Sequence, residues 1–195
     1  MLPHLLAIVF IILAASPSFA DCVINGTCTG APSDVPALGS WRYELTMSWD
    51  NTRHGMSHLD LIIDDGLNCS DADLQSGLTF PAAAGHGDGE DGCPLVYEAD
   101  FSPHGDPSLG LTVPMFKFEP DESEGCEAGP TGSATFVFYS DYAPYPVAEH
   151  NLALVEKYAG YMCVGNLSGE FPALPCAPVG NTETNWSTIK AEYSR

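Results

Sequence analysis

Residues 41–49 carry the pattern that most restricts the fold of this chain. From Trp41 to Trp49 every second residue is large and apolar, and the residues between them are polar or charged. A period of two over this length is typical of a β-strand with one buried face. We therefore predict a strand here whose buried face is rich in aromatic rings.

Other segments also have the composition of strands. Residues 57–63 and 133–139 are rich in β-branched, aromatic and other apolar residues, and we predict a strand in each. Residues 111–118 suit a strand as well, but Pro114 cannot donate a ladder hydrogen bond and predicts an edge or bulged strand. Residues 152–164 fit either a strand pair or a short helix.

Loops rich in Gly, Pro and Asp separate these strands, and residues 71–92 are predicted to be mostly loop. The chain contains 19 Gly and 16 Pro, which make long helices costly. We therefore predict an all-β fold, an immunoglobulin-like β-sandwich with long acidic and Gly/Pro-rich loops, braced by disulfides. We expect this domain at 41–178, after an extended leader at 21–40 and before a C-terminal tail at 179–195.

The N-terminal segment predicts export. Residues 5–15 form an almost unbroken apolar run, and Ser18-Phe19-Ala20 places small residues at the two positions that a signal peptidase reads. The run is too short to span about 30 Å of hydrocarbon. We therefore predict a signal peptide at 1–20 and a secreted, extracellular mature chain without a membrane span.

All seven cysteines follow the predicted cleavage site, and disulfides persist in extracellular surroundings. Sequence does not determine connectivity, but we favour Cys22–Cys28, Cys69–Cys93 and Cys163–Cys176, with Cys126 left unpaired. Asn25-Gly26, a strong tight-turn signal, would then lie inside the first small loop. The cysteine spacings are irregular and include no Cys-x-x-Cys pair, which argues against a zinc site.

Several short motifs resemble those of secreted bacterial β-sandwich domains with an immunoglobulin-like outline and no assigned activity. These motifs are Trp41-x-Tyr43, Ser57-His58-Leu59 with Cys69 downstream, Phe136-x-Phe138, Ala153-Leu154-Val155-x-Lys157-x-x-Gly160 and Gly165-x-Leu167-Ser168-Gly169. The resemblance covers the core of residues 41–176. It supports the predicted fold and implies no chemistry.

The mature chain is strongly acidic. Its formal net charge of −20 excludes nucleic acid as a partner, because the phosphates would be repelled, and it disfavours anionic membrane surfaces. The charge suits either a solubilising surface or the binding of cations. The segment 86–92 is the best candidate for the second role, because carboxylates on a Gly-rich loop are ligands that calcium prefers. We predict a calcium site formed by Asp88, Glu90 and Asp91.

Two histidine arrangements bear on function. One resembles a metal-binding pair and the other a catalytic serine–histidine pair, and neither meets the requirements of its motif. His54 and His58 are four residues apart, but Gly55 stands where a zincin needs Glu. Ser57 precedes His58 directly, and neighbours in a strand point to opposite faces. We therefore expect no hydrogen bond between the Ser57 and His58 side chains.

Four asparagines lie in acceptor sequons for N-linked glycans: Asn25, Asn68, Asn166 and Asn185. Glycosylation would require a eukaryotic secretory pathway.

We have no sequence signal for a specific ligand. The favoured function is a secreted, non-catalytic binding, adhesive or structural module that recognises an unspecified extracellular ligand or surface. The alternative is a secreted hydrolase whose acidic residues converge in the fold.

Overall fold

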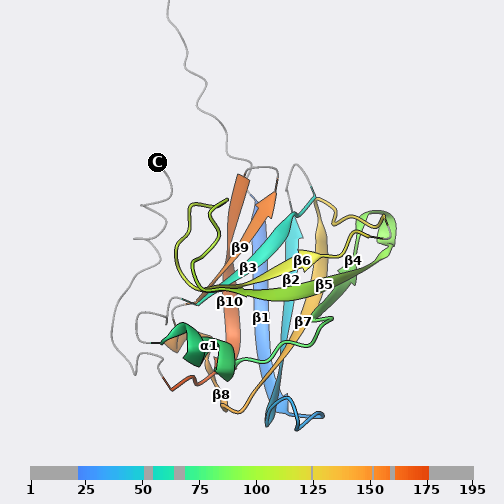
Figure 1. Ribbon diagram of the computed structural model, residues 1–195. Helices are drawn as coiled ribbons and strands as arrows, with labels where there is room; N and C mark the ends of the chain where they lie inside the picture. The colour runs from blue at the N-terminus through green and yellow to red at the C-terminus, as the bar shows by residue number, and fades with distance from the viewer. Residues whose placement is uncertain are drawn as a thin grey trace, which may run out of the picture.

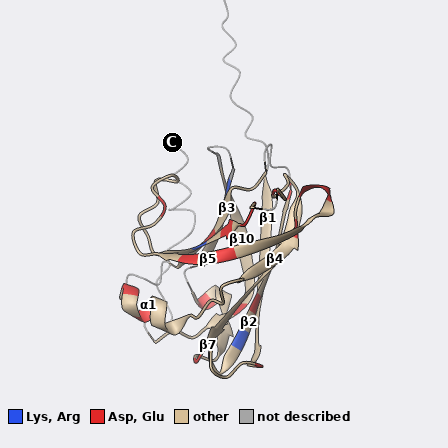
Figure 2. Ribbon diagram, turned by 45° about the vertical axis from the view of Figure 1, so that its right-hand side comes forward, with Lys and Arg blue, Asp and Glu red and all other residues tan. Residues whose placement is uncertain are grey.

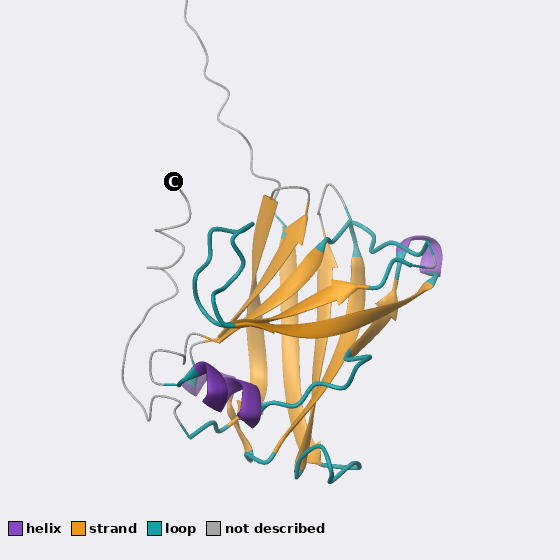
Figure 3. Ribbon diagram, viewed as in Figure 1, coloured by secondary structure: helices purple, strands orange, loops and turns teal. Residues whose placement is uncertain are grey.

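The computed structural model describes residues 22–50, 55–63, 69–123, 125–150, 152–158 and 161–175. The predicted signal peptide, His54 and the C-terminal tail lie outside these ranges. The described part of the chain consists mainly of strands (Figures 1 and 3). The strands are β1 (Val23–Pro32), β2 (Trp41–Asp50), β3 (His58–Ile63), β4 (Gly85–Asp88), β5 (Pro94–Ser102), β6 (Met115–Pro120), β7 (Gly132–Ser140), β8 (Pro144–Pro146), β9 (Leu152–Tyr158) and β10 (Tyr161–Pro172). The helical elements are α1 (Asp71–Gly77) and the 3₁₀ turns η2 (Glu90–Gly92) and η3 (Val147–Glu149).

Nine of these strands form a closed ring, in the order β1-β2-β7-β4-β5-β6-β3-β9-β10, and β10 pairs again with β1. Every neighbouring pair in the ring is antiparallel except β1–β10, which is parallel. A ring with an odd number of strands cannot alternate direction throughout, so closure requires a parallel pair. β8 stands outside the ring and pairs with the end of β10.

The predicted β-sandwich is therefore wrong, although the all-β class is confirmed. A sandwich and a barrel both alternate buried and exposed residues along each strand, so periodicity does not distinguish them. The β1–β10 pairing joins segments from opposite ends of the domain and leaves the ring without a free edge. Residues 23–32, which fall within the predicted leader, form the β1 side of this pairing.

Large side chains fill the inside of the barrel. The fully buried rings include Tyr43, Tyr97, Phe118, Phe136, Phe138 and Phe171. Tyr43 stacks on Phe138 with ring centroids 5.2 Å apart, and the centroids of Phe118 and Phe136 are 4.5 Å apart. The interior is a packed core, as in other barrels of modest strand number.

The predicted strands at 41–49, 57–63 and 133–139 are confirmed as β2, β3 and β7. Residues 152–164 form a strand pair, β9 and β10, and not a helix. Pro114 lies just before β6, which pairs on both sides, so the prediction of an edge or bulged strand is wrong.

The stretch 71–92 contains more regular structure than predicted. It holds α1, β4 and η2 in addition to loop. The signal for α1 is a capping box: the Ser70 hydroxyl accepts from the Asp73 backbone N–H, and the Asp73 carboxylate accepts from the Ser70 N–H. Ser70-x-x-Asp73 was present in the sequence but stands in a polar, Gly-rich context that masks it.

The disulfides differ from all three favoured pairs. Cys22 bonds to Cys163 and Cys93 bonds to Cys126. Cys69 is also disulfide-bonded. Among the cysteines that the structure describes, the unpaired thiol is Cys28 and not Cys126. Burial, together with the charge of Glu170, raises the pKa of the Cys28 thiol to about 12.

The predicted turn at Asn25-Gly26 is wrong as well, because both residues lie within β1. Gly26 faces the barrel interior, where a Cβ would overlap Leu154 Cδ1. The glycine therefore permits close packing of the Leu154 side chain against β1.

A second, smaller core lies on the outside of the barrel under the loop formed by residues 103–114, which joins β5 to β6 (yellow-green in Figure 1). Its buried members are Ile62, Leu111, Met115, Ala153 and Val155. Both faces of β3 are consequently buried: one packs into the barrel and the other against this loop.

Acidic residues lie on α1, on β5 and on several loops (Figure 2). None of the helices in the described ranges is both long enough and apolar enough to cross a membrane.

Candidate metal centre

Three ionisable side chains meet between β3 and the 103–114 loop. His58 and Asp60 are two residues apart on β3 and therefore share its outer face. Asp106 comes from the loop. All three are buried, with exposed fractions of 3% for His58, 0% for Asp60 and 6% for Asp106. They are the group of possible metal ligands that converges within the described part of the chain.

The donor atoms are close together but poorly aligned for hydrogen bonding. His58 Nε2 lies 2.8 Å from Asp106 Oδ2 and 3.4 Å from Asp60 Oδ2. None of these three atoms, nor Asp60 Oδ1, forms a well-aligned hydrogen bond within the described residues. Ligands bound about 2.0–2.2 Å from a tetrahedral zinc ion lie roughly 3.3–3.6 Å from one another. The separation between His58 and Asp60 falls in that range, the one between His58 and Asp106 is shorter, and all three donor atoms lie within 4.8 Å of one another.

The other ring nitrogen of His58 has a contact of its own, which bears on the proton inventory of the site. His58 Nδ1 lies 3.3 Å from the hydroxyl of Ser57. When Nδ1 carries the proton and donates it to Ser57, Nε2 presents a lone pair to two carboxylate oxygens. Three acceptors then face one another in a buried site, which is unfavourable unless a proton or a metal ion lies between them.

The contact between Ser57 and His58 corrects the expectation that these side chains could not hydrogen-bond. β3 begins at His58, so Ser57 precedes the strand and does not follow its alternation. The Ser57 N–H donates to the Lys157 carbonyl at 2.7 Å, and its side chain is exposed. A hydroxyl on the second nitrogen is the kind of outer contact that orients metal-binding histidines.

The loop holds Asp106 in place through its own backbone. Asp106 Oδ1 accepts from the Ser108 N–H at 2.7 Å, and its carbonyl accepts from the Leu109 and Leu111 N–H groups at 3.1 Å. Gly105 has a φ of +75°, and a Cβ there would overlap the Leu111 carbonyl. This tight turn fixes the direction of the Asp106 carboxylate toward His58.

The two carboxylates have shifted pKa values in opposite directions. Burial raises the pKa of Asp60, against the lowering effect of His58. Burial also acts to raise the pKa of Asp106, but the hydrogen bonds from Ser108 and the charges of His58 and Lys117 outweigh it, and the pKa is lowered. Asp106 is therefore the more readily ionised of the two groups.

Lys117 supplies the nearest fixed positive charge. It lies opposite Asp60 in the β3–β6 pairing, and its Nζ is 3.8 Å from Asp106 Oδ2. The same ammonium is closer to Glu119, at 2.6 Å. One lysine therefore serves three carboxylates, those of Asp60, Asp106 and Glu119.

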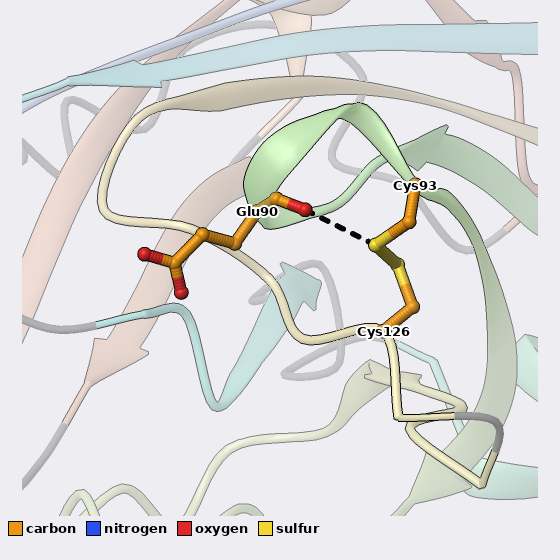
Figure 4. The surroundings of a disulfide bond; sticks show 3 residues. All are labelled: Glu90, Cys93 and Cys126. Atoms are coloured by element: carbon orange, nitrogen blue, oxygen red, sulfur yellow. Dashed lines mark hydrogen bonds between the residues drawn. A yellow bond between two sulfur atoms is a disulfide. The ribbon is translucent and has the colours of Figure 1, made fainter.

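The predicted calcium loop lies elsewhere on the barrel. Asp88 ends β4, and Glu90 and Asp91 belong to η2; all three are exposed. The Glu90 N–H donates to the Glu127 carbonyl at 2.6 Å, and the Cys93 sulfur lies 3.1 Å from the Glu90 main-chain oxygen (Figure 4). The Cys93–Cys126 disulfide pins this loop to the segment before β7. Calcium binding by Asp88, Glu90 and Asp91 stays a prediction.

Sequence reasoning missed Asp60 and Asp106. His58-x-Asp60 offered a signal, because a charged residue within an otherwise apolar strand must be paired if both strand faces are buried. No comparable signal marks Asp106, since its place depends on how the 103–114 loop folds back over β3.

Comparisons with known proteins give no family. No protein-family model matches the chain, and no curated protein matches it. Among solved structures, the seventh ScaB type I cohesin from Pseudobacteroides cellulosolvens is similar over 81% of this chain and 97% of that chain, with 11% sequence identity and a TM-score of 0.27. This likeness is too distant to assign a function.

Proposed function

We propose that this chain is an exported, disulfide-braced binding module that holds a divalent transition-metal ion between His58, Asp60 and Asp106. The main support for this proposal is that one buried imidazole nitrogen and two buried carboxylate oxygens converge without aligned hydrogen bonds. A proton on Nε2 bonds well to one oxygen at a time, whereas a metal ion serves all three donors. The mixed nitrogen and oxygen donors favour zinc or manganese over calcium, which prefers oxygen alone.

The position of the site favours a structural and not a catalytic role. The ligands are almost fully buried, so a bound ion would have little access to substrate. The ion would join the 103–114 loop to β3 and secure the second core beneath it. The apolar leader and the disulfides support export to an oxidising space.

The test is thermal unfolding of the mature chain after chelation and then with Zn²⁺, Mn²⁺ or Ca²⁺. A ligand that binds only the folded state stabilises it by about 2.7 kcal/mol at a hundredfold excess over Kd. We expect a higher midpoint with Zn²⁺ or Mn²⁺, and loss of that shift in Asp60→Asn and Asp106→Asn. Asp100→Asn is the matched control, because Asp100 is an exposed aspartate on β5 outside the site.

The same experiment separates the two predicted cation sites. Asp88→Ala with Glu90→Ala removes ligands from the exposed loop and leaves His58, Asp60 and Asp106 unchanged. A calcium-induced shift that disappears in this variant would support the loop site. A Zn²⁺ shift that survives in Asp60→Asn and Asp106→Asn would contradict the proposed centre.

A second function, a serine hydrolase, is favoured by one specific arrangement. Ser57 Oγ contacts His58 Nδ1, and His58 Nε2 contacts Asp106, which is the order of a nucleophile, a base and an orienting acid. Ser57 also lines a cavity of about 420 Å³ together with acidic residues such as Glu119 and Glu127.

Asp60 distinguishes the two functions, because it is a ligand in the metal centre and has no part in the serine relay. A fluorophosphonate probe should label Ser57 if the relay is active, and Asp60→Asn should keep that labelling while losing the Zn²⁺ shift. Absence of labelling in the intact protein would exclude the hydrolase.

A further inference from the structure

Two of the four sequons meet on the outside of the barrel. Asn25-Gly26-Thr27 lies in β1 and Asn166-Leu167-Ser168 lies in β10, the parallel pair that closes the ring. The register places Asn25 opposite Asn166 and Thr27 opposite Ser168. The two sequons therefore run side by side in the same direction and at the same level.

Both asparagine side chains are available to solvent. Asn25 and Asn166 are exposed, whereas Ile24 and Cys28 on the alternate positions of β1 are buried in the barrel. Within the described part of the chain, neither amide group is engaged in a hydrogen bond. A substituent on either amide nitrogen would extend away from the core without displacing a packed group.

The hydroxyls of the two sequons are bonded to each other. Thr27 Oγ1 lies 3.2 Å from Ser168 Oγ, and the Ser168 hydroxyl donates to the Gly26 carbonyl at 3.2 Å. Because the single Ser168 proton is used in that bond, Thr27 is the donor in the pair. These contacts hold the two sequons in register across the β1–β10 pair, the seam that closes the barrel.

We infer that Asn25 and Asn166 form one acceptor site for a single N-linked glycan on this seam. The donor is a lipid pyrophosphate-linked oligosaccharide. A bond forms between the asparagine amide nitrogen and the anomeric carbon, the bond from that carbon to the pyrophosphate oxygen breaks, and the amide proton leaves with the pyrophosphate. The inference is independent of the metal centre, which lies on β3 and the 103–114 loop.

Crowding limits the pair to one glycan. Neighbouring strands are about 4.8 Å apart, so glycans on Asn25 and Asn166 would begin within roughly one strand spacing of each other. A saccharide ring is about as wide as that spacing, and both rings would stand on the same outward-facing row. A chain with both sites filled therefore resists the β1–β10 pairing that closes the barrel, and the folded, secreted product carries one.

The test uses the full chain with its leader, secreted from a eukaryotic cell line. Asn68→Gln and Asn185→Gln remove the other two sequons. Thr27→Ala and Ser168→Ala are the informative variants, because each abolishes one sequon and leaves both asparagines in place. Intact mass is measured before and after treatment with peptide N-glycosidase F in H₂¹⁸O, which marks the glycosylated asparagine.

We expect the background protein to carry one glycan per molecule, found on Asn25 in some molecules and on Asn166 in others. In Thr27→Ala all of the glycan should be found on Asn166, and in Ser168→Ala all of it should be found on Asn25. The double variant should carry no glycan at either asparagine. Protein without a glycan at either position, or secreted molecules with glycans at both, would overturn the inference. Asn25→Gln and Asn166→Gln repeat the comparison with the hydroxyl bond intact.

Discussion

Glu156 is the most unusual single residue in the barrel core. It lies on β9 with Leu152 and Leu154, whose side chains belong to the main core, and alternation directs it into the same interior. Its exposed fraction is 0%, and neither carboxylate oxygen has a hydrogen-bond partner within the described residues. Burial raises its pKa from 4.5 to about 7. Tyr97 nearby has a raised pKa, through burial and through the charges of Glu156 and Glu122.

A raised carboxyl pKa makes stability depend on pH in a defined direction. The folded state holds the Glu156 proton more tightly than the unfolded state, so the stabilisation is complete below the unfolded pKa and is lost as pH rises to about 7. The free energy of unfolding should fall by roughly 3 kcal/mol between pH 4.5 and pH 7 from this group. Glu156→Gln should remove that part of the fall and raise stability at pH 8.

Urea unfolding at pH 5 and pH 8 measures this effect. Glu98→Gln, at an exposed position on β5, is the matched control and should keep the pH dependence. An equal loss of stability with pH in Glu156→Gln and in the unchanged protein would show that Glu156 is not its source.

At the scale of elements, β10 pairs with three different strands along its length. Its residues 161–165 pair with β9, 166–169 pair with β1, and 170–172 pair with β8. Gly169 stands at the last change of partner with a φ of +94°, and a Cβ there would overlap the Cys28 carbonyl. The bend therefore needs glycine for both conformation and space.

Gly169→Ala should consequently destabilise the fold by about 2 kcal/mol or more, because it adds backbone strain and a steric clash at a closed seam. The thermal midpoint measures the loss. Glu170→Ala alters the exposed neighbouring residue and should change the midpoint little. A Gly169→Ala protein as stable as the Glu170→Ala protein would contradict this account of the bend.

For the whole molecule, closure of the ring is the decisive feature. The parallel β1–β10 pairing is reinforced by the Cys22–Cys163 disulfide, which joins the residue before β1 to β10 across a sequence separation of 141. Cys93–Cys126 spans a separation of 33 and joins two loops on one side of the barrel. Chain entropy makes the longer crosslink the more stabilising one.

We expect Cys22→Ser with Cys163→Ser to lower stability by about 5 kcal/mol, and Cys93→Ser with Cys126→Ser by about 4 kcal/mol, as the loop lengths predict. Denaturant unfolding of the two double variants gives the comparison. The reverse order of stability would show that the seam does not depend on its disulfide.

The local features of this protein follow from its amino-acid sequence. The alternation at 41–49 predicted β2 and its buried face, and the composition at 133–139 predicted β7, because strand formation and face burial depend on neighbouring residues. The apolar leader and the cysteines predicted export and disulfide bracing, of which the bracing is observed. His58 and Asp60 could also have been recognised as a pair from their spacing.

Which segments meet depends on long-range packing. A period of two shows which face of a strand is buried but not which strand lies beside it, so a sandwich and a barrel looked alike until β1 paired with β10. The same limit explains the wrong disulfides, since Cys22 and Cys163 come together only when the ring closes. It also explains why Asp106 was missed: its carboxylate reaches His58 because a loop distant in sequence packs over β3, a contact set by burial of the second core and not by any local pattern.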